Sequence, residues 1–386
     1  MGLGQGALES MAVRGQAPFG GAFSGKTVLV TGHTGFKGSW LCLWLRELGA
    51  EVVGYALRPD TKPSLFEQLG LSRLIESHIG DVRDLSRLRK VLKESRPEIV
   101  FHLAAQPIVR LSYERPVETF STNVLGTVHL LEAVRKTDSV RVCQIITSDK
   151  CYENREWDYA YRESDRLGGH DPYSASKACA EIVTASYRDS FFQPDREDHH
   201  RVCVSSVRAG NVIGGGDWAM DRILPDCVRA LSQGKPILVR NPKAVRPWQH
   251  VLEPLSGYLR LCSLQLRHPA RYAQAWNFGP MGWADASVGD VADMAVRCWG
   301  SGKWVSPKAD KAAPHEAKTL KLDCSKARDI LKWRPIYTLE ESVVKAVEWY
   351  RDSFKDKRFN ALDYTRAQIR EYVRRSRDKR QPWAVS

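Results

Sequence analysis

The sequence predicts an α/β protein, built as a doubly wound parallel sheet with a smaller, interleaved mixed α/β lobe. Short apolar runs alternate with helix-like segments four times before Ile146, a pattern typical of parallel strands joined by right-handed crossovers. A glycine-rich turn separates the first apolar run from the first helix-like segment. At 386 residues with 43% hydrophobic content, the chain exceeds a typical single domain and can bury a large core.

The first strand is expected at Lys26–Val30, and the turn after it contains Gly32, Gly35 and Gly38. Glycines at this spacing let backbone amides approach a pyrophosphate, and the amino end of the next helix favours the same anion. A tight turn without a ligand is the alternative, but the order of strand, turn and helix favours dinucleotide binding and a Rossmann-type sheet. The residues assigned to the cofactor are Gly32, His33, Thr34, Gly35, Phe36 and Lys37.

The second strand, Glu51–Leu57, departs from the usual dinucleotide pattern because no acidic residue ends it. Arg58 stands where an acid would bind the ribose 2′-hydroxyl of NAD, and an arginine suits the 2′-phosphate of NADP instead. The motif alone therefore leaves the choice between NAD and NADP open. A third strand ends before Asp81 and Val82, and Asp81 is placed to accept a hydrogen bond from the adenine of the cofactor.

The fourth strand begins at Ile99, and its mostly small exit residues suit a position beside the cofactor. The exit consists of Leu103, Ala104 and Ala105, followed by Gln106 as a candidate substrate contact. Asn123 lies inside a helical segment expected at 118–137 and is a candidate cofactor ligand. A polar amide in such a place is more often a satisfied structural group, so both interpretations of Asn123 stay open.

The candidate catalytic residues begin at the end of the fifth strand. Ser148, Asp149 and Lys150 follow an apolar run at 140–146 that is typical of a buried parallel strand. Ligands of an open parallel sheet bind outside the carboxyl ends of its strands. We therefore expect these three residues to meet the glycine turn at that edge of the sheet.

A helix expected to enter at Pro172 carries the other two candidate catalytic residues. Tyr173 and Lys177 are four residues apart, so they share one face of that helix. A nearby cation lowers the pKa of a tyrosine from about 10, which makes Tyr173 a candidate base for alcohol oxidation beside the Ser148 hydroxyl. An ordinary helical pair is the alternative for this spacing alone.

Two later segments predict contacts with a ligand. Residues 208–218 are rich in glycine and hydrogen-bonding groups, as in a loop that bends around a bound molecule. Residues 240–250 combine basic side chains with a tryptophan, which suits phosphate and a nucleoside base, although a solvated basic turn is the alternative. The substrate contacts assigned in this part of the chain are Asn211, Asp217, Trp218, Arg222, Arg246 and Trp248.

Together these motifs resemble the extended short-chain dehydrogenase/reductases, an NAD-dependent epimerase and dehydratase family, over about residues 25–350. Within that family the chain resembles the CDP-sugar branch of the nucleotide-sugar 4,6-dehydratases. Ser148–Asp149–Lys150 stands where the dTDP-glucose and GDP-mannose branches usually carry Thr-Asp-Glu or Ser-Glu. The other segments that fit this branch are Gly32–Trp40, Arg208–Trp218 and Arg246–Val251. The resemblance implies CDP-glucose as substrate and a tightly held NAD, despite the missing acid at position 58.

The resemblance also implies a mechanism. Tyr173, assisted by Lys177 and Ser148, removes the C4 hydroxyl proton while hydride leaves C4 for the nicotinamide, and the resulting ketone acidifies C5. Asp149 protonates the departing C6 hydroxyl, Lys150 takes the C5 proton or stabilises the enolate, and hydride returns to C6. The alternatives are a nucleotide-sugar epimerase, which would not need an adjacent acid and base at 149 and 150, and a non-catalytic dinucleotide sensor.

The net charge of +13 does not indicate nucleic-acid binding. Residues 350–386 hold 11 Lys and Arg against 5 Asp and Glu, without the interleaved aromatic residues of a base-stacking surface. Nine scattered cysteines without C-x-x-C spacing predict reduced thiols and no metal site. The absence of a long apolar run or a secretory signal predicts a soluble cytoplasmic protein, and helices 118–137 and 177–192 are candidates for a homodimer interface.

These patterns divide the chain into four parts. Residues 1–25 contain seven glycines and almost no apolar periodicity, so a flexible extension is expected there. Residues 26–207 are expected to form the NAD-binding domain, to which a segment near 245–280 returns. Residues 208–350 would mainly bind the nucleotide-sugar, and 351–386 form a basic C-terminal tail.

Overall fold

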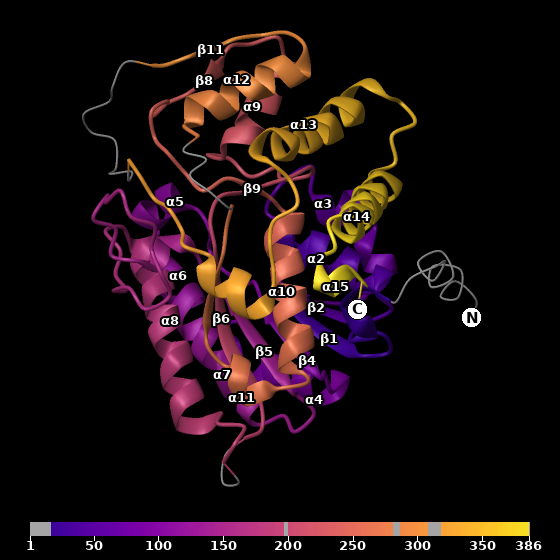
Figure 1. The fold of residues 1–386 in the computed structure, drawn as a ribbon, viewed down its shortest axis with the longest axis vertical. Coiled ribbons are helices and arrows are strands. Elements are labelled where there is room, and N and C mark those ends of the chain that lie inside the picture. The colour runs from indigo at the N-terminus through magenta and orange to yellow at the C-terminus, as the bar shows by residue number, and fades with distance from the viewer. Residues whose placement is uncertain (1–16, 197–199, 281–285, 308–317, 386) are drawn as a thin grey trace.

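The structure is a computed structural model that describes residues 17–196, 200–280, 286–307 and 318–385. At its centre lies a seven-stranded parallel sheet with the strand order β10-β6-β5-β4-β1-β2-β3 (Figure 1). Its strands are β1 (Thr27–Thr31), β2 (Glu51–Ala56), β3 (Glu76–Ile79), β4 (Ile99–His102), β5 (Val142–Ile146), β6 (Cys203–Ala209) and β10 (Ala275–Phe278). The predicted doubly wound parallel sheet is therefore confirmed.

Helices cover both faces of the sheet because successive residues of a strand point to opposite sides. Val28 and Val30 of β1 belong to a core shared with α2 and α10, whereas Leu29 belongs to a second core shared with α4, α7 and α8. These helices are α2 (Phe36–Glu47), α4 (Leu85–Ser95), α7 (Gly126–Arg135), α8 (Pro172–Phe191) and α10 (Leu252–Gln265). The strands have continuous apolar sequences because both of their faces are buried.

A smaller lobe lies at one end of the sheet, where α9, α12 and α13 pack against one another (Figure 1). The two short parallel strand pairs outside the main sheet are β8 with β11 and β7 with β9. The elements of this part are β7 (Val212–Ile213), α9 (Ile223–Ser232), β8 (Ile237–Leu238), β9 (Gln249–His250), α12 (Val288–Trp299), β11 (Trp304–Val305) and α13 (Leu339–Lys355). Between β9 and α12 the chain returns to the main sheet through α10 and β10, so the lobe and the sheet are interleaved.

Several short elements complete the described fold. The short α-helices are α3 (Leu65–Gln68), α5 (Val109–Glu114), α6 (Pro116–Phe120) and α11 (Pro269–Tyr272). The 3-10 helical turns are η2 (Leu71–Arg73) and η4 (Asp149–Cys151). The wider π-helical turns are η3 (Ser121–Leu125) and η5 (Ala327–Leu331). The predicted continuous helix at 118–137 is therefore made of three consecutive pieces, with the wide turn η3 between α6 and α7.

The expectation of a flexible extension up to residue 25 is wrong for its last part, and residues 1–16 lie outside the described residues. A short helical turn, η1 (Pro18–Gly21), places Phe19 and Phe23 in the core, each 1% exposed. Phe19 stacks on Trp383 with ring centroids 4.7 Å apart and meets the edge of Trp44 in α2. The two aromatic residues stabilise this segment although its glycine content suggested otherwise.

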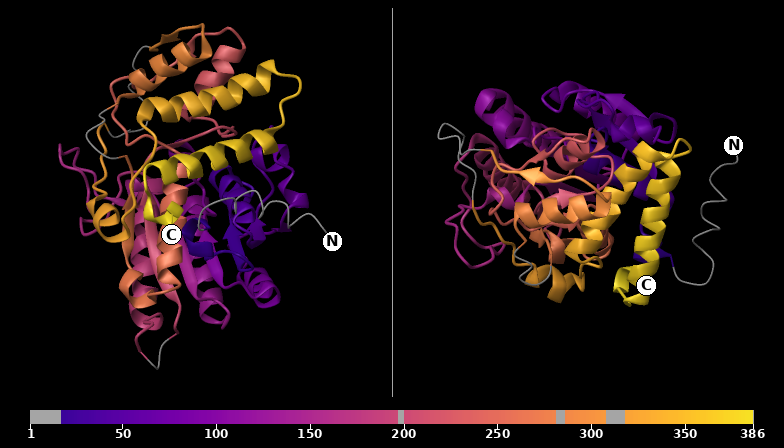
Figure 2. Two further views of the ribbon diagram at one scale, coloured as in Figure 1. Left: turned by 45° about the vertical axis from the view of Figure 1, so that its right-hand side comes forward. Right: turned by 90° about the horizontal axis from the view of Figure 1, so that it is seen from above.

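The basic C-terminal segment is helical and packs against the cofactor-side helix α2. It consists of the end of α13, then α14 (Ala361–Asp378) and α15 (Pro382–Val385), which run along one side of the molecule (Figure 2). Arg366 and Arg370 of α14 form ion pairs of 2.9 and 3.2 Å with the buried Glu47 at the end of α2. Part of the tail's positive charge therefore serves to hold α14 on the sheet domain.

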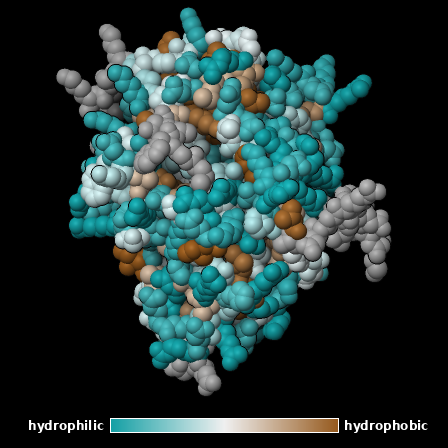
Figure 3. Space-filling view, in the orientation of Figure 1, coloured by the Kyte–Doolittle hydropathy of each residue, from teal (hydrophilic) through white to brown (hydrophobic). Residues whose placement is uncertain are grey.

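The surface contrasts with the two cores. The face shown in Figure 3 is mainly hydrophilic, and apolar residues gather on it only in small patches. The larger apolar side chains are concentrated in the cores on either side of the sheet. Within the described ranges, no helix combines the length and apolar character needed to span a membrane.

Candidate active site

The glycine turn between β1 and α2 has the shape of an anion-binding site. Gly32 has a φ of +75°, and a Cβ at this position would lie 2.7 Å from the backbone nitrogen of Ala104. A Cβ at Gly38 would lie 2.1 Å from the Gly32 oxygen, so the helix packs too closely for a larger residue. Gly35 precedes α2, is exposed, and leaves the first turn of the helix without a side-chain cap. These open amides at a helix amino end fit the pyrophosphate of a dinucleotide.

His33 and Thr34, predicted as cofactor contacts, hold this turn through hydrogen bonds to neighbouring strands. The His33 Nε2 atom lies 2.7 Å from Ser77 Oγ, and burial lowers the pKa of His33 to about 4, so its ring is neutral. Thr34 donates a hydrogen bond of 2.9 Å to the Leu57 carbonyl. Both side chains therefore fix the turn to β2 and β3, and direct contact with the cofactor stays a prediction.

The predicted adenosine contacts lie at the ends of β2 and β3. Arg83 holds both oxygens of Asp81 at distances between 2.6 and 3.0 Å, and these hydrogen bonds lower the pKa of the Asp81 carboxyl. Val82 is buried against the start of α7, and Arg58 is exposed just beyond β2. The carboxylate of Asp81 is thus charged and held in place, and the roles of Arg58 and Val82 stay predictions.

The exit of β4 runs beside the glycine turn. Leu103 donates from its backbone to the Thr31 carbonyl at 3.1 Å, and Ala104 donates to the Thr31 hydroxyl at 3.2 Å. This arrangement brings the segment that continues into Ala105 next to Gly32, as the sequence predicts.

For Asn123, the structure favours the structural alternative. Its Oδ1 accepts a hydrogen bond of 2.8 Å from the Gln106 amide, and its Nδ2 donates to the Gln106 carbonyl and to Ser176 Oγ. The side-chain amide of Gln106 bonds Ile108 and Thr119 within the protein, and its contact with the substrate stays a prediction. Both amides join the β4 exit to η3 and α8.

The end of β5 presents a buried carboxylate with unused bonding capacity. The Ser148 hydroxyl caps η4 by accepting a bond of 3.2 Å from the Lys150 amide, and it donates to Asp149 Oδ1 at 3.0 Å. Asp149 is 1% exposed, and its Oδ2 atom has no hydrogen-bond partner among the described residues. A buried oxygen of this kind is rarely left without a partner unless a ligand uses it.

Helix α8 brings the predicted tyrosine and lysine to the same place. Asp171 accepts a bond of 2.9 Å from the Ser174 amide and Pro172 fills the first position, so the helix begins one residue before Tyr173. Both Tyr173 and Lys177 are buried, and Lys177 Nζ donates to the Ile146 carbonyl at 3.3 Å. The predicted meeting of this helix with the end of β5 is therefore observed.

The expected lowering of the Tyr173 pKa is wrong for the structure without bound ligands. Burial raises the pKa of Tyr173 to about 12, and only partial compensation comes from a hydrogen bond with Ser148 and from the charge of Arg222. Burial also lowers the pKa of Lys177 to about 8, while the Glu181 carboxylate acts in the opposite direction. Tyr173 thus depends on its cationic neighbours to become a base.

Lys37 is a further charged member of the cluster that the sequence analysis assigned only to the cofactor. Burial, together with the charges of Arg222 and Lys177, lowers the pKa of Lys37 to about 7, and the charge of Asp149 acts in the opposite direction. A lysine inside a glycine turn at a helix amino end is itself an unusual signal, because the helix dipole disfavours a cation there. That signal could have identified Lys37 as part of the reaction site.

The predicted substrate residues fall into two groups. Arg222 begins α9, forms an ion pair of 2.8 Å with the buried Asp217, and affects the pKa of Tyr173. The Oδ1 atom of Asn211 is buried and has no partner among the described residues, so it is available for a ligand. The effect on Tyr173 places Arg222 near the catalytic cluster, and a contact of Asn211 with the substrate stays a prediction.

The second group is used within the protein. Trp248 is 6% exposed and donates to the Ala286 carbonyl at 3.2 Å, so its indole nitrogen is bonded within the protein. Arg246 donates to the carbonyls of Val245 and Lys318 and is 9% exposed. Trp218 donates to Gln68 at 2.8 Å and packs against α13. Contacts of these three residues with the substrate stay predictions.

No group of three His, Cys, Asp or Glu side chains that could hold a metal ion occurs within the described ranges. All nine cysteines are free, and seven of them are buried.

Comparisons with known proteins agree with this site. A family model for GDP-mannose 4,6-dehydratases matches residues 29–346. The CDP-glucose 4,6-dehydratase of Salmonella typhimurium is 53% identical over 330 residues, which cover 85% of this chain and 91% of that protein. The GDP-mannose 4,6-dehydratase of Vibrio cholerae is 27% identical, with 83% of this chain and 92% of that protein covered.

Solved structures show the same fold. MoeE5, solved in complex with UDP-glucose and NAD, superimposes with a TM-score of 0.70 at 27% identity, covering 85% of this chain and all of that one. The UDP-glucose 4-epimerase of Thermotoga maritima reaches a TM-score of 0.73 at 21% identity, with the same coverage, and supports the fold alone. Because the family model spans most of the sequence, the chain belongs to the GDP-mannose 4,6-dehydratase family, the nucleotide-sugar dehydratases among the extended short-chain dehydrogenase/reductases.

Proposed function

We propose that the protein is an NAD-dependent CDP-glucose 4,6-dehydratase that converts CDP-D-glucose to CDP-4-keto-6-deoxy-D-glucose and water. The observation that carries this proposal is the convergence of Ser148, Asp149 and Tyr173 in one buried site. The choice of CDP-glucose follows from the relative with 53% identity and from the Ser148–Asp149–Lys150 sequence at the end of β5.

The glycine turn is the proposed site of the NAD pyrophosphate, since the first turn of α2 is open and Gly32 and Gly38 allow close approach. When bound, NAD supplies an acceptor for the C4 hydride and later returns this hydride to C6. Asp81 is held by Arg83 at the end of β3, where it can receive the adenine amino group. NAD rather than NADP is proposed because MoeE5 was solved with NAD, although Arg58 replaces the usual acid.

In this function Tyr173 accepts the C4 hydroxyl proton, and its hydrogen bond with Ser148 favours the phenolate. The Ser148 hydroxyl, which donates to Asp149 in the structure, would turn towards Tyr173 for this step. The charge of Arg222 opposes the effect of burial on Tyr173, and Lys177, four residues along the same helix, is the second cation assigned to this role. The C4 ketone that results makes the C5 proton acidic. The substrate is then ready for loss of water.

For the elimination, Asp149 acts in its protonated form: its Oδ2 atom, which has no partner among the described residues, gives its proton to the departing C6 hydroxyl, so that water leaves and a carboxylate remains. Lys150, half-buried at the same strand end, takes the C5 proton or stabilises the enolate. The same residue can return a proton to C5 when C6 is reduced. Oxidation and reduction balance within one substrate, so no second substrate is required.

A nucleotide-sugar epimerase is the second candidate because Tyr173, Lys177 and Ser148 would serve it equally. Asp149 argues against it, since an epimerase needs no acid for a departing C6 hydroxyl. The test is incubation of the purified protein with CDP-, dTDP-, GDP- and UDP-sugars, followed by mass measurement. A product lighter by one water from CDP-glucose supports the dehydratase, an unchanged mass with altered stereochemistry supports the epimerase, and no turnover supports a dinucleotide sensor.

A second experiment follows the hydride. CDP-glucose deuterated at C4 is mixed with unlabelled substrate of distinguishable mass, and the product is analysed by mass and NMR. We expect deuterium at C6 without exchange between the two substrate pools, and a solvent proton at C5. Label in water or at C4 would contradict the mechanism proposed for Ser148 to Lys177.

We also propose that the protein forms a homodimer through α6, η3 and α8. Val117, Leu125 and Ile182 on these elements are 81%, 52% and 57% exposed, which is unusual for large apolar side chains that serve no contact. An Ile182→Glu variant should sediment as a monomer, whereas Leu238→Glu, on the exposed strand β8, should not change the assembly.

The free thiols of the chain further support a cytoplasmic, reducing location.

A further inference from the structure

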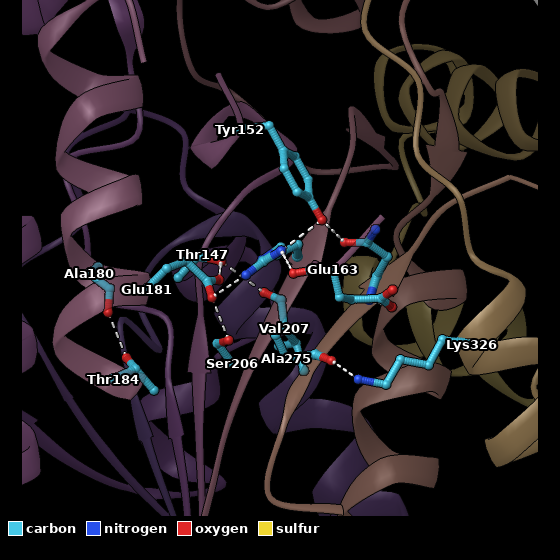
Figure 4. A network of polar contacts seen from close by, with 12 residues as sticks. Thr147, Tyr152, Glu163, Ala180, Glu181, Thr184, Ser206, Val207, Ala275 and Lys326 are labelled. Carbon is cyan, nitrogen blue, oxygen red and sulfur yellow. Dashed lines mark hydrogen bonds and ion pairs between the residues drawn. The ribbon is translucent and has the colours of Figure 1, made fainter. Parts of the chain in front are cut away.

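A buried polar network reaches the catalytic segment at Thr147, and Glu181 belongs to this network (Figure 4). Glu181 is on α8, four residues after Lys177, and its side chain is 2% exposed. It forms an ion pair of 2.8 Å with Arg208, accepts a bond of 2.6 Å from Ser206, and also accepts one from Thr147. These donors come from β6 and from the residue that precedes Ser148.

Arg208 continues the network to the other end of the catalytic segment. It donates to the Tyr152 hydroxyl at 2.8 Å and to the Glu163 carbonyl at 3.1 Å. Tyr152 in turn donates to Asn277 of β10 at 2.7 Å. The segment that carries Ser148, Asp149 and Lys150 is therefore tied at both ends, at Thr147 through Glu181 and at Tyr152 through Arg208.

Four titratable groups from four elements act on Lys177 or respond to its charge. They are Glu181 of α8, Cys151 of η4, His102 of β4 and Lys37 of α2. Burial keeps the thiol of Cys151 and the ring of His102 neutral at pH 7, because it raises the first pKa and lowers the second to about 3. Lys37 is a base that repels the Lys177 cation when protonated. Of these four groups, Glu181 alone supplies the negative charge that favours protonated Lys177.

We propose that Glu181, paired with Arg208, is a positioning residue that keeps Lys177 protonated beside Tyr173 and holds the segment from Thr147 to Tyr152 in place. The expected effect of Glu181 on turnover rests on the proposed function. The expected effect of Glu181 on the charge of Lys177 does not depend on that function. Glu181 itself acts through Lys177 and the strand end and has no assigned contact with substrate.

The first test compares the pH dependence of kcat in the wild type and in Glu181→Gln. Without the carboxylate, Lys177 loses its proton at a lower pH, so the alkaline decline in kcat should move down by about one unit or more. Glu181→Asp keeps the charge and should keep the alkaline limb near its original position. Thr184→Val, on the same helix but bonded only to the Ala180 carbonyl, is the matched control and should not move it.

The second test needs no substrate and uses urea unfolding of the unliganded protein from pH 6 to pH 10. In the wild type the folded pKa of Lys177 is about 8 and the unfolded one about 10.5, so stability rises with pH between these values. In Glu181→Gln this rise should start at lower pH, and the deficit against the wild type should shrink as Lys177 becomes neutral in both proteins. A deficit that is constant with pH would overturn the proposal and indicate a purely structural role.

Glu181→Gln leaves Arg208 buried without its ion-pair partner and could prevent folding. The double variant Glu181→Gln/Arg208→Met removes both charges and should restore stability while retaining the shifted pH dependence. If the double variant has the pH dependence of the wild type, the proposal is overturned. Absence of dehydration in the wild type would overturn the proposed function instead, and the unfolding comparison would still decide the role of Glu181.

Discussion

Two buried carboxylates on either side of Lys177 differ in how their hydrogen bonds are used. Glu181 is bonded by Thr147, Ser206 and Arg208, whereas Asp149 receives one bond from Ser148 and has an oxygen without a described partner. Both side chains are almost fully buried, so exposure does not distinguish them. The difference indicates that a carboxylate with every bond satisfied positions its neighbours, and that an incompletely bonded one is available for chemistry.

The largest expected effect comes from changes to the residues assigned to the reaction, the group to which Asp149 belongs. Tyr173→Phe removes the proposed base, so kcat should fall by about 10²-fold to 10⁴-fold while folding and NAD content stay intact. Circular dichroism and the absorbance of released cofactor check the last two points. A loss of kcat smaller than tenfold would contradict the role of Tyr173 as the base and would indicate a supporting role instead.

Asp149→Asn should reduce overall turnover by about 10²-fold, since the amide cannot protonate the departing C6 hydroxyl. Oxidation at C4 should continue, so reduced nicotinamide is expected to accumulate and to be visible by its near-ultraviolet absorbance. Asp165→Asn is a suitable control because Asp165 lies on a loop and accepts a bond from the Arg162 amide. Equal losses in oxidation and elimination would show that Asp149 supports the site rather than taking part in the elimination.

Lys37 extends the comparison to a cation, because it is half-buried and has no ion pair in the described part of the chain. Its pKa is about 7 in the folded protein and about 10.5 when unfolded, so below pH 7 the folded state carries the full desolvation cost. Lys37→Met should therefore stabilise the unliganded protein at pH 6, by roughly 2 kcal/mol, and the gain should disappear towards pH 10. Chemical denaturation at several pH values measures this, and a gain independent of pH would contradict the assignment.

The smallest effect on turnover is expected from a change to Trp248, which we assign to the residues that support the fold. Trp248→Phe should cost about 1–2 kcal/mol of stability because it removes a buried hydrogen bond and some packing. The KM for CDP-glucose should change less than about twofold, since the ring faces the core. A tenfold rise in KM would restore the interpretation of Trp248 as a base-stacking residue.

The sheet and the cofactor turn were predictable because local sequence determines them. Sequence patterns identified five of the strands within a few positions, and glycines 32, 35 and 38 identified the turn. The spacing of Tyr173 and Lys177 placed them on one helical face without any knowledge of tertiary contacts. Such features depend on backbone geometry and on periodicity, which a single sequence displays.

The failed predictions concern residues whose roles depend on distant partners. For Trp248 and Arg246, whose contacts with a ligand stay predictions, the sequence also did not show the hydrogen bonds to the Ala286 and Lys318 carbonyls. The pKa of Tyr173 was predicted from its neighbour Lys177 alone, whereas burial by the whole fold dominates it. Phe19 lies among glycines, and its partner Trp383 is at the other end of the sequence.

The stack of Phe19 on Trp383 also has a consequence for synthesis. On a ribosome, Phe19 emerges long before Trp383, so the two rings can meet only after the whole segment between them has been made. Until then Trp44 on α2 lacks the Trp383 contact, which is 6.2 Å between ring centroids in the finished protein. A chain cut short before Trp383 would remain in this unfinished state, with an apolar surface of the kind that chaperones and proteases recognise.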